Sequence, residues 1–489
     1  MEGVSAPSYW LTRFCFQRAL GFIYLIAFLV TANQFRALIG GHGLLPVPIF
    51  LKWVKFWDSP SLFWLNASDR FMAAAAWAGV FLSVIAVTGV SERFGVWFSA
   101  AVWFLLWVFY LSFVNVGQTF YGFGWETMLL EAGFLAIFLG SADTPPPVAV
   151  IWLYRWMLFR VMFGAGLIKL RGDACWRDLT CMFYHYETQP IPNPLSWYLH
   201  HLPPLVHRAG TAFTHFIEVA MPWLYFVPRT AGVIGGLSAV VFQVMLILSG
   251  NLSWLNYLTI AIAIPCFDDA FLGRFIPLSL STATGAPMGD VRRVVIGLLT
   301  VGLLSLSVRP AMNLISRTQM MNASFEPLHL LNTYGAFGSV TKERNEIVIE
   351  GTDEAAILPG TRWKEYEFKA KPGNPHRRPA VIAPYHLRLD WLMWFAAMDD
   401  YQHHPWFLNL VAKLLQNDSK TIKLMAGNPF SGAPPRYVRA VLYRYRFTTP
   451  AEKKETGDWW HRDPVRLYLP PVSLENSEFK ALLQRLGWL

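Results

Sequence analysis

Charged residues are scarce in this sequence: Asp, Glu, Lys and Arg make up 15% of its 489 residues, whereas soluble globular domains carry about 25%. The scarcity is confined to the first part of the chain, because residues 1–309 hold 32 charged side chains and residues 310–489 hold 41. This distribution argues against a purely soluble protein. There is also no block of consecutive basic residues, so nucleic acid is not expected as a partner.

Cysteine is rare as well, and four residues are too few for a disulfide scaffold. Cys175 and Cys181 lie in one segment between apolar runs, and they are expected to pair only if that segment faces an oxidising compartment. Two free thiols are the alternative. The sequence has no metal-ligand spacing, no phosphate-binding loop and no serine nucleophile elbow, so no metal site is expected.

Long apolar runs are abundant in the first part of the chain. A helix needs about 20 apolar residues to cross a bilayer. We therefore predict an α-helical polytopic membrane bundle of 8–9 spans over residues 1–310. The runs lie at residues 14–32, 72–90, 95–116, 125–140, 148–170, 211–228, 231–249, 253–267 and 291–309. Loops at 33–71 and 171–210 are rich in Trp, Tyr and Pro, which predicts ordered caps at the membrane interface.

The pattern changes in residues 311–489, for which we predict a β-rich α+β domain. Short segments that alternate apolar and charged residues between turn signals are typical of half-buried strands. The strands are expected at Glu346–Glu350, Trp363–Phe368 and Arg439–Phe447, and helices at Leu389–Met398 and Pro405–Leu415.

Ionisable side chains within apolar runs are costly to bury, so they are informative. Glu126, Glu131, Arg155 and Arg160, with Lys169 and Glu218, supply three carboxylates and three cations. The first interpretation is structural pairing within the bundle. The second is a site that handles protons or a polar headgroup.

The second interpretation centres on three side chains. His215 and Glu218 are three residues apart and share one helix face, as a base with an orienting carboxylate would. Lys169 ends an apolar run, where a lysine either reaches the headgroups or acts as a desolvated base. An ordinary hydrogen-bonded pair is the alternative for His215 and Glu218.

Several motifs, in order along nearly the whole chain, resemble the lipase maturation factor family. They are Gly117–Phe120 with Trp125 and Glu126, Glu187–Pro192, Asn332–Gly338, Pro384–Trp391, Gly427–Phe430, Pro434–Arg439 and Trp459–Arg462. The resemblance implies a membrane protein that helps secreted homodimeric lipases reach their active fold, with a luminal C-terminal domain. The location it implies is the endoplasmic reticulum membrane, or the inner membrane with a periplasmic domain in a bacterial homologue. It implies no cofactor.

A shorter segment, Gly166–Leu170 with Trp176, is similar to part of the vitamin K-dependent gamma-carboxylase. In that family the matching lysine is the proposed base acting on a reduced quinone. The similarity implies an alternative function, a membrane enzyme that acts on a quinone or lipid with Lys169 as base and His215 and Glu218 assisting.

The function that we expect first is a non-enzymatic, chaperone-like maturation factor. The bundle would anchor the protein in the bilayer, and the C-terminal domain would bind a partly folded lipase and limit its aggregation. Aromatic side chains dominate many interfaces, so five tryptophans are candidate client contacts; the alternative is that they fill the core of the domain itself. These candidates are Trp391, Trp394, Trp406, Trp459 and Trp460.

Overall fold

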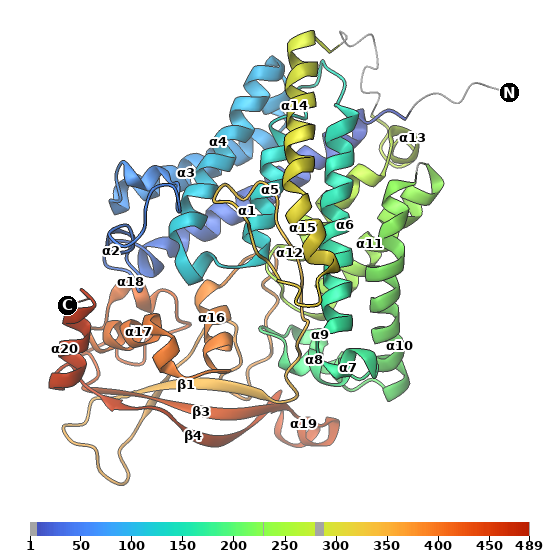
Figure 1. The fold of residues 1–489 in the computed structure, drawn as a ribbon. Coiled ribbons are helices and arrows are strands. Elements are labelled where there is room, and N and C mark those ends of the chain that lie inside the picture. Colours follow the sequence, from blue (N-terminus) through green and yellow to red (C-terminus); the bar gives the residue numbers. More distant parts are fainter. Residues whose placement is uncertain (1–6, 228, 279–287, 489) are drawn as a thin grey trace.

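The first part of the chain folds into a helical bundle, and the last part forms a smaller α+β layer against one end of that bundle (Figure 1). The structure is a computed structural model that describes residues 7–227, 229–278 and 288–488. Within the described residues, six helical segments are long and apolar enough to cross a membrane. They are α1 (Trp10–Leu38), α3 (Asp69–Val87), α4 (Gly95–Val116), α6 (Val148–Arg171), α11 (Thr230–Ser249) and α14 (Asp290–Leu306) continued by α15 (Val308–Ile315).

The number of spans differs from the expected 8–9, because three predicted runs are short or broken. The run at 125–140 forms the 13-residue α5 (Gly124–Ala136), and the run at 253–267 forms α12 (Leu255–Ala263) with a 3₁₀ turn at Ile264–Cys266. The run at 211–228, whose last residue lies outside the described part, is divided among α10 (Pro204–His215), a π turn (Phe216–Ala220) and a 3₁₀ helix (Met221–Phe226). Short apolar runs also suit helices buried inside a bundle, and hydropathy alone does not separate the two cases.

Proline explains two of these interruptions. Pro222 is the second residue of the 3₁₀ helix at Met221–Phe226, and Pro265 lies in the 3₁₀ turn after α12. A proline has no backbone N–H to donate and its ring clashes with the preceding turn, so a regular α-helix cannot continue through it.

The two predicted caps are ordered and partly helical. Residues 33–71 contain the end of α1, then α2 (Val47–Phe50) and a 3₁₀ turn (Leu62–Trp64). Residues 171–210 contain α7 (Ala174–Arg177), α8 (Met182–Thr188), α9 (Pro194–His200) and the start of α10. Asn193 caps α9 by accepting from the backbone of Leu195 and Ser196, which satisfies amides that a helix start leaves free. Further short 3₁₀ turns lie at Val90–Glu92 and Gln118–Tyr121, and α13 spans Asp269–Leu272.

The C-terminal layer contains a four-stranded antiparallel sheet in the order β2-β1-β3-β4. Its strands are β1 (Arg344–Thr352), β2 (Lys364–Tyr366), β3 (Tyr437–Phe447) and β4 (Trp460–Val472). The three predicted strands are therefore present, and β4 is additional. Strand β4 contains Pro464, Pro470 and Pro471 and pairs with β3 through register shifts. Proline is tolerated on an edge strand because the outer side needs no donors.

Helices cover the sheet face that points toward the bundle (Figure 1). They are α16 (Arg388–Ala396), α17 (Pro405–Leu415), preceded by a 3₁₀ turn (Tyr401–His403), and α18 (Ser419–Ile422); α19 (Pro450–Thr456) and α20 (Ser477–Arg485) complete the layer. Ile347 and Ile349 of β1 are fully buried in the same apolar core as Phe407 and Leu410 of α17. This α+β arrangement agrees with the predicted class, and the two predicted helices are present.

Candidate functional site

A cavity of about 480 Å³ lies where the bundle meets the C-terminal layer. Its walls come from α5, α6, α11 and α12 of the bundle, from residues 334–339, and from α16. Most lining side chains are apolar, among them Met128, Met162, Phe242, Leu246 and Trp391. The cavity is therefore a largely apolar space that is lined by elements from both parts of the chain.

Lys169 and Glu218 form an ion pair in the wall of this cavity. Lys169 Nζ donates to both carboxylate oxygens of Glu218 at 2.6 Å, and both side chains are almost fully buried. Lys169 is in the last turn of α6, and Glu218 lies on the π turn after α10. A Cβ at Gly166 would lie 2.7 Å from Val219 Cγ2, so the absence of a side chain there lets the π turn approach α6. The predicted pairing within the bundle is present at this position.

His215 does not complete the predicted dyad. Its Nε2 lies 3.0 Å from the backbone oxygen of Trp176, while the partner of Glu218 is Lys169. Lys169 Nζ also lies 5.4 Å from the centre of the Trp176 ring. The structure thus gathers these side chains around Trp176, with His215 on the backbone rather than on the carboxylate.

Glu131 and Arg160 form the second buried pair of the bundle. Glu131 also accepts from the Tyr334 hydroxyl at 2.7 Å and from the backbone N–H of Asn332 at 3.0 Å, and Arg160 donates to the backbone oxygen of Asn332 at 2.6 Å. The first motif after the last span, Asn332–Gly338, is therefore fastened to α5 and α6 by charged hydrogen bonds, which are stronger than neutral ones.

The remaining carboxylate and cation do not pair within the bundle, contrary to the first interpretation. Glu126 pairs with Arg388 of the C-terminal layer at 2.6 Å, and both are fully buried. Arg155 instead donates to the backbone oxygens of Pro265 at 2.9 Å and Tyr225 at 3.3 Å. Sequence analysis missed Arg388 because its partner is 262 positions away. Its place within the motif Pro384–Trp391 is the one signal that could have identified it.

Two amide side chains line the cavity with few partners. Asn256 of α12 is buried, and its Oδ1 has no hydrogen-bond partner among the described residues. Gln243 of α11 reaches only the sulfur of Met162, at 3.5 Å from its Nε2, within the same described part. His185 of α8 also lines the cavity, and burial lowers its pKa to about 4, so this imidazole is neutral near pH 7. These three polar side chains of the cavity wall are therefore uncharged near pH 7.

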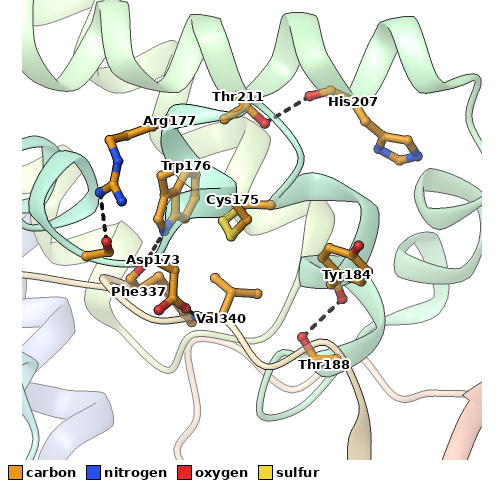
Figure 2. Close-up of a disulfide and its surroundings, with 12 residues drawn as sticks. Asp173, Cys175, Trp176, Arg177, Tyr184, Thr188, His207, Thr211, Phe337 and Val340 are labelled. Atoms are coloured by element: carbon orange, nitrogen blue, oxygen red, sulfur yellow. Dashed lines mark hydrogen bonds between the residues drawn. A yellow bond between two sulfur atoms is a disulfide. The ribbon is translucent and has the colours of Figure 1, made fainter.

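Cys175 and Cys181 form a disulfide, so the first of the two alternatives holds. Figure 2 shows this bridge beside Trp176, Phe337 and Val340. Trp176 Nε1 donates to the Phe337 carbonyl at 2.8 Å, a bond drawn in the same figure. The bridge therefore packs against the segment 337–340, of which residues 337–339 line the cavity. No group of three metal-ligating side chains occurs among the residues that the structure describes.

The five candidate tryptophans divide into two classes. Trp391, Trp406 and Trp460 are buried: Trp391 packs against Trp125, Trp406 against Phe120, and Trp460 against Phe447. As client contacts these three are wrong for this conformation, because they fill the core. Trp394 is half-buried and donates to the Thr188 carbonyl at 2.9 Å, and Trp459 is half-buried beneath the Lys453 ammonium, 3.2 Å from the ring centre.

Comparisons with known proteins agree over both parts of the chain. Residues 11–274 match the family model of the lipase maturation factor transmembrane domain, and residues 330–470 match that of the lipase maturation factor C-terminal domain. The chain is 44% identical to lipase maturation factor 1 of Homo sapiens, over 98% of this chain and 91% of that protein. Identity to lipase maturation factor 1 of Mus musculus is 45%, over 96% and 88%.

More distant relatives have the same kind of name. Identity to lipase maturation factor 2 of Homo sapiens is 29%, over 98% of this chain and 85% of that protein. No solved structure matches the chain significantly. With two family models matched in order and close relatives aligned over nearly its full length, the chain belongs to the lipase maturation factor family.

Proposed function

We propose that this chain is a membrane-anchored maturation factor that helps secreted homodimeric lipases fold and assemble in the endoplasmic reticulum. The observation that carries the proposal is the 44% identity to human lipase maturation factor 1, which extends through the membrane bundle and the C-terminal layer alike. The bundle anchors the protein, and the C-terminal layer holds the exposed apolar surface of the client until its subunits meet.

The Cys175–Cys181 disulfide supports a luminal position for the C-terminal layer. The bridge packs against Val340, and β1 of the C-terminal layer begins shortly after this residue, at Arg344. The disulfide and the C-terminal layer therefore lie at the same end of the bundle. Disulfides persist in the lumen of the endoplasmic reticulum and are rare in the cytosol.

A surface around Trp459, here called the Trp459 surface and consisting of Tyr198, Lys453 and Trp459, is the client contact that we favour. Tyr198 is 53% exposed and its ring centre lies 6.3 Å from that of Trp459. Aromatic rings that combine an apolar body with a polar edge are enriched among residues that dominate binding energy. Trp459 packs against a buried cluster of Trp197, Tyr445, Phe447 and Trp460, which supports this surface from below.

The test is the specific activity of a co-expressed dimeric lipase, per unit of secreted lipase, in cells that lack an endogenous factor. The native chain is expected to restore activity, and Trp459→Ala to lower the restored activity by about tenfold, the loss typical of a dominant interface residue. Trp57→Ala is the control, because Trp57 is 80% exposed on the 33–71 cap and is not part of the Trp459 surface.

Absence of any restored activity with the native chain, at normal expression, would contradict the maturation function. Equal losses for Trp459→Ala and Trp57→Ala would leave the maturation function standing and refute the Trp459 surface as the client contact.

An enzymatic function on a quinone or lipid is the second candidate, because Lys169 and Glu218 both line the cavity. Lys169→Ala alone leaves Glu218 without its cation, so the matched variant Lys169→Met/Glu218→Gln removes both charges together. If chemistry at Lys169 is required, the double variant expresses normally and restores no lipase activity. Full activity of the double variant refutes catalysis by this lysine.

A further inference from the structure

We propose that the cavity between the bundle and the C-terminal layer is a binding site for one uncharged amphipathic lipid, of the class of a monoacylglycerol. The acyl chain would fill the apolar part of the cavity, and hydroxyl or ester groups would bond to the side-chain amides of Asn256 and Gln243. This site is separate from the client surface, and its occupancy can be measured whether or not the maturation function holds.

The size and the walls of the cavity suit such a molecule. Its volume of about 480 Å³ lies within the range of about 300–1,000 Å³ that is typical of small-molecule sites. Met128, Met162 and Leu246 contribute apolar, flexible walls, and methionine adapts readily to irregular apolar shapes. A largely apolar space at one end of a membrane bundle favours an acyl chain over a polar metabolite.

The side-chain amides of Asn256 and Gln243 indicate where the polar end of the lipid binds. Asn256 is only 2% exposed, and its Oδ1 has no partner among the described residues although its side chain lines the cavity. Buried polar atoms in native proteins are nearly always hydrogen-bonded, since an unpaired one loses its hydration without compensation. A ligand hydroxyl can donate to Asn256 Oδ1. Gln243 can donate to a ligand carbonyl, since its Nε2 meets only the Met162 sulfur among the described residues.

The charges around the cavity select an uncharged head. Lys169 and Glu218 neutralise each other at 2.6 Å, and His185 carries no charge near pH 7 because burial lowers its pKa to about 4. A carboxylate or phosphodiester entering here would have to compete with Glu218 for Lys169 and leave one anion unpaired in a buried site, which is costly. Hydroxyl and ester groups avoid this penalty.

The experiment uses the full chain in phosphatidylcholine nanodiscs with a monoacylglycerol that carries a diazirine on its acyl chain. After illumination, labelled peptides are mapped by mass spectrometry. Labelling is expected on the buried cavity wall, at Met162 and neighbouring residues of α6 and α11, and excess unlabelled monoacylglycerol is expected to suppress it. Excess oleate is expected to leave it unchanged.

Three variants separate ligand binding from structural damage. Asn256→Leu is expected to lower cavity labelling about tenfold, the effect of one buried hydrogen bond, without lowering the thermal midpoint of the lipid-free protein, because it removes an unpaired amide. Leu246→Trp fills the cavity and is expected to abolish labelling. Leu248→Trp, two residues along the same helix and 52% exposed, is the matched control and keeps native labelling.

Equal labelling of Leu246→Trp and Leu248→Trp would show that the lipid does not occupy the cavity, which overturns the proposal. Suppression by oleate as strong as by monoacylglycerol would overturn the assignment of an uncharged head. Unchanged labelling of Asn256→Leu would refute the role given to this amide.

Discussion

Replacing Arg388 by alanine would break a fully buried link between the bundle and the C-terminal layer. Arg388 donates to Glu126 at 2.6 Å and to the Phe120 carbonyl at 2.7 Å, and its guanidinium lies 3.6 Å from the centre of the Tyr121 ring. Both charged side chains have 0% exposure. Arg388→Ala leaves the Glu126 carboxylate buried with the Tyr110 hydroxyl as its remaining partner.

The magnitude follows from this burial. Removing one member of a buried ion pair costs about 3–5 kcal/mol, because the other charge loses its compensation and cannot regain water. At about 1.4 kcal/mol per factor of ten, the equilibrium that keeps α16 docked on the bundle falls by roughly two to four orders of magnitude. We therefore expect α16 to separate from the bundle far more often in Arg388→Ala than in the native chain.

Hydrogen exchange of residues 384–396 in nanodiscs measures this directly, since exchange reports local opening free energies. Arg388→Ala is expected to lower their protection by the factor above, and Arg388→Met/Glu126→Leu to recover most of it, because an apolar replacement of a buried pair is often neutral. Arg444→Ala is the control: its ion pair with Glu343 is exposed on both sides and its loss costs less than about 1 kcal/mol. Equal protection in Arg388→Ala and Arg444→Ala would refute the reasoning.

Three further substitutions and one control have defined outcomes. Cys175→Ser opens the disulfide and is expected to destabilise the protein by about 2 kcal/mol, the value for closing so short a loop, measured as a lower thermal midpoint. Burial lowers the pKa of His185 to about 4 in the folded protein, so between pH 6.5 and pH 4 the unfolded chain binds a proton that the folded protein does not. The free energy of unfolding therefore does not change with this group above pH 6.5 and decreases by about 1.4 kcal/mol per pH unit as the pH falls toward 4. His185→Gln is expected to remove this pH dependence from unfolding curves. Gly164→Ala places a Cβ 2.5 Å from the Tyr334 carbonyl oxygen and is expected to lower the thermal midpoint and lipase rescue. A Cβ at Gly297 would have no neighbour within 4 Å among the described residues, so Gly297→Ala is expected to be stabilising by up to about 1 kcal/mol.

Each of these outcomes has a result that contradicts it. A thermal midpoint of Cys175→Ser that equals the native value under oxidising conditions would mean that the bridge adds no stability. Identical pH slopes for the native chain and His185→Gln would mean that this imidazole is not the titrating group. Equal effects at Gly164 and Gly297 would mean that α6 tolerates a methyl group where the structure shows close contact.

Much of the fold could be predicted from local pattern. Alternation in Arg439–Phe447 predicted a strand that the structure contains, because alternating side chains match one buried face of a sheet. The helix predicted at Pro405–Leu415 is also present, but it is buried on nearly all sides. The additional strand β4 was missed because its three prolines are signals against a strand, and they are tolerated only on an edge. Edge position is a property of the assembled sheet.

The sequence predicted which residues form the candidate site better than it predicted the contacts between them. The charged residues singled out in the apolar runs are buried, and a buried charge needs a partner. Glu126 pairs with Arg388, and Glu218 pairs with Lys169 rather than with His215. Spacing of three residues on a helix predicted the His215–Glu218 contact, and the π turn at Phe216–Ala220 changes the geometry there. Asn256 gave no signal in the sequence, because nothing local distinguishes a paired amide from an unpaired one.

The sequence by itself determined the division into a charge-poor membrane part and a charged globular part, and its ordered motifs determined the family. Those features depend on composition and on neighbours along the chain. Only the tertiary structure decided which charges pair, which tryptophans are buried and where a cavity remains, since these depend on side chains such as Arg388 and Glu126 that lie 262 positions apart. The free energy of a buried charge depends on its partner in space, and the sequence does not specify that partner locally.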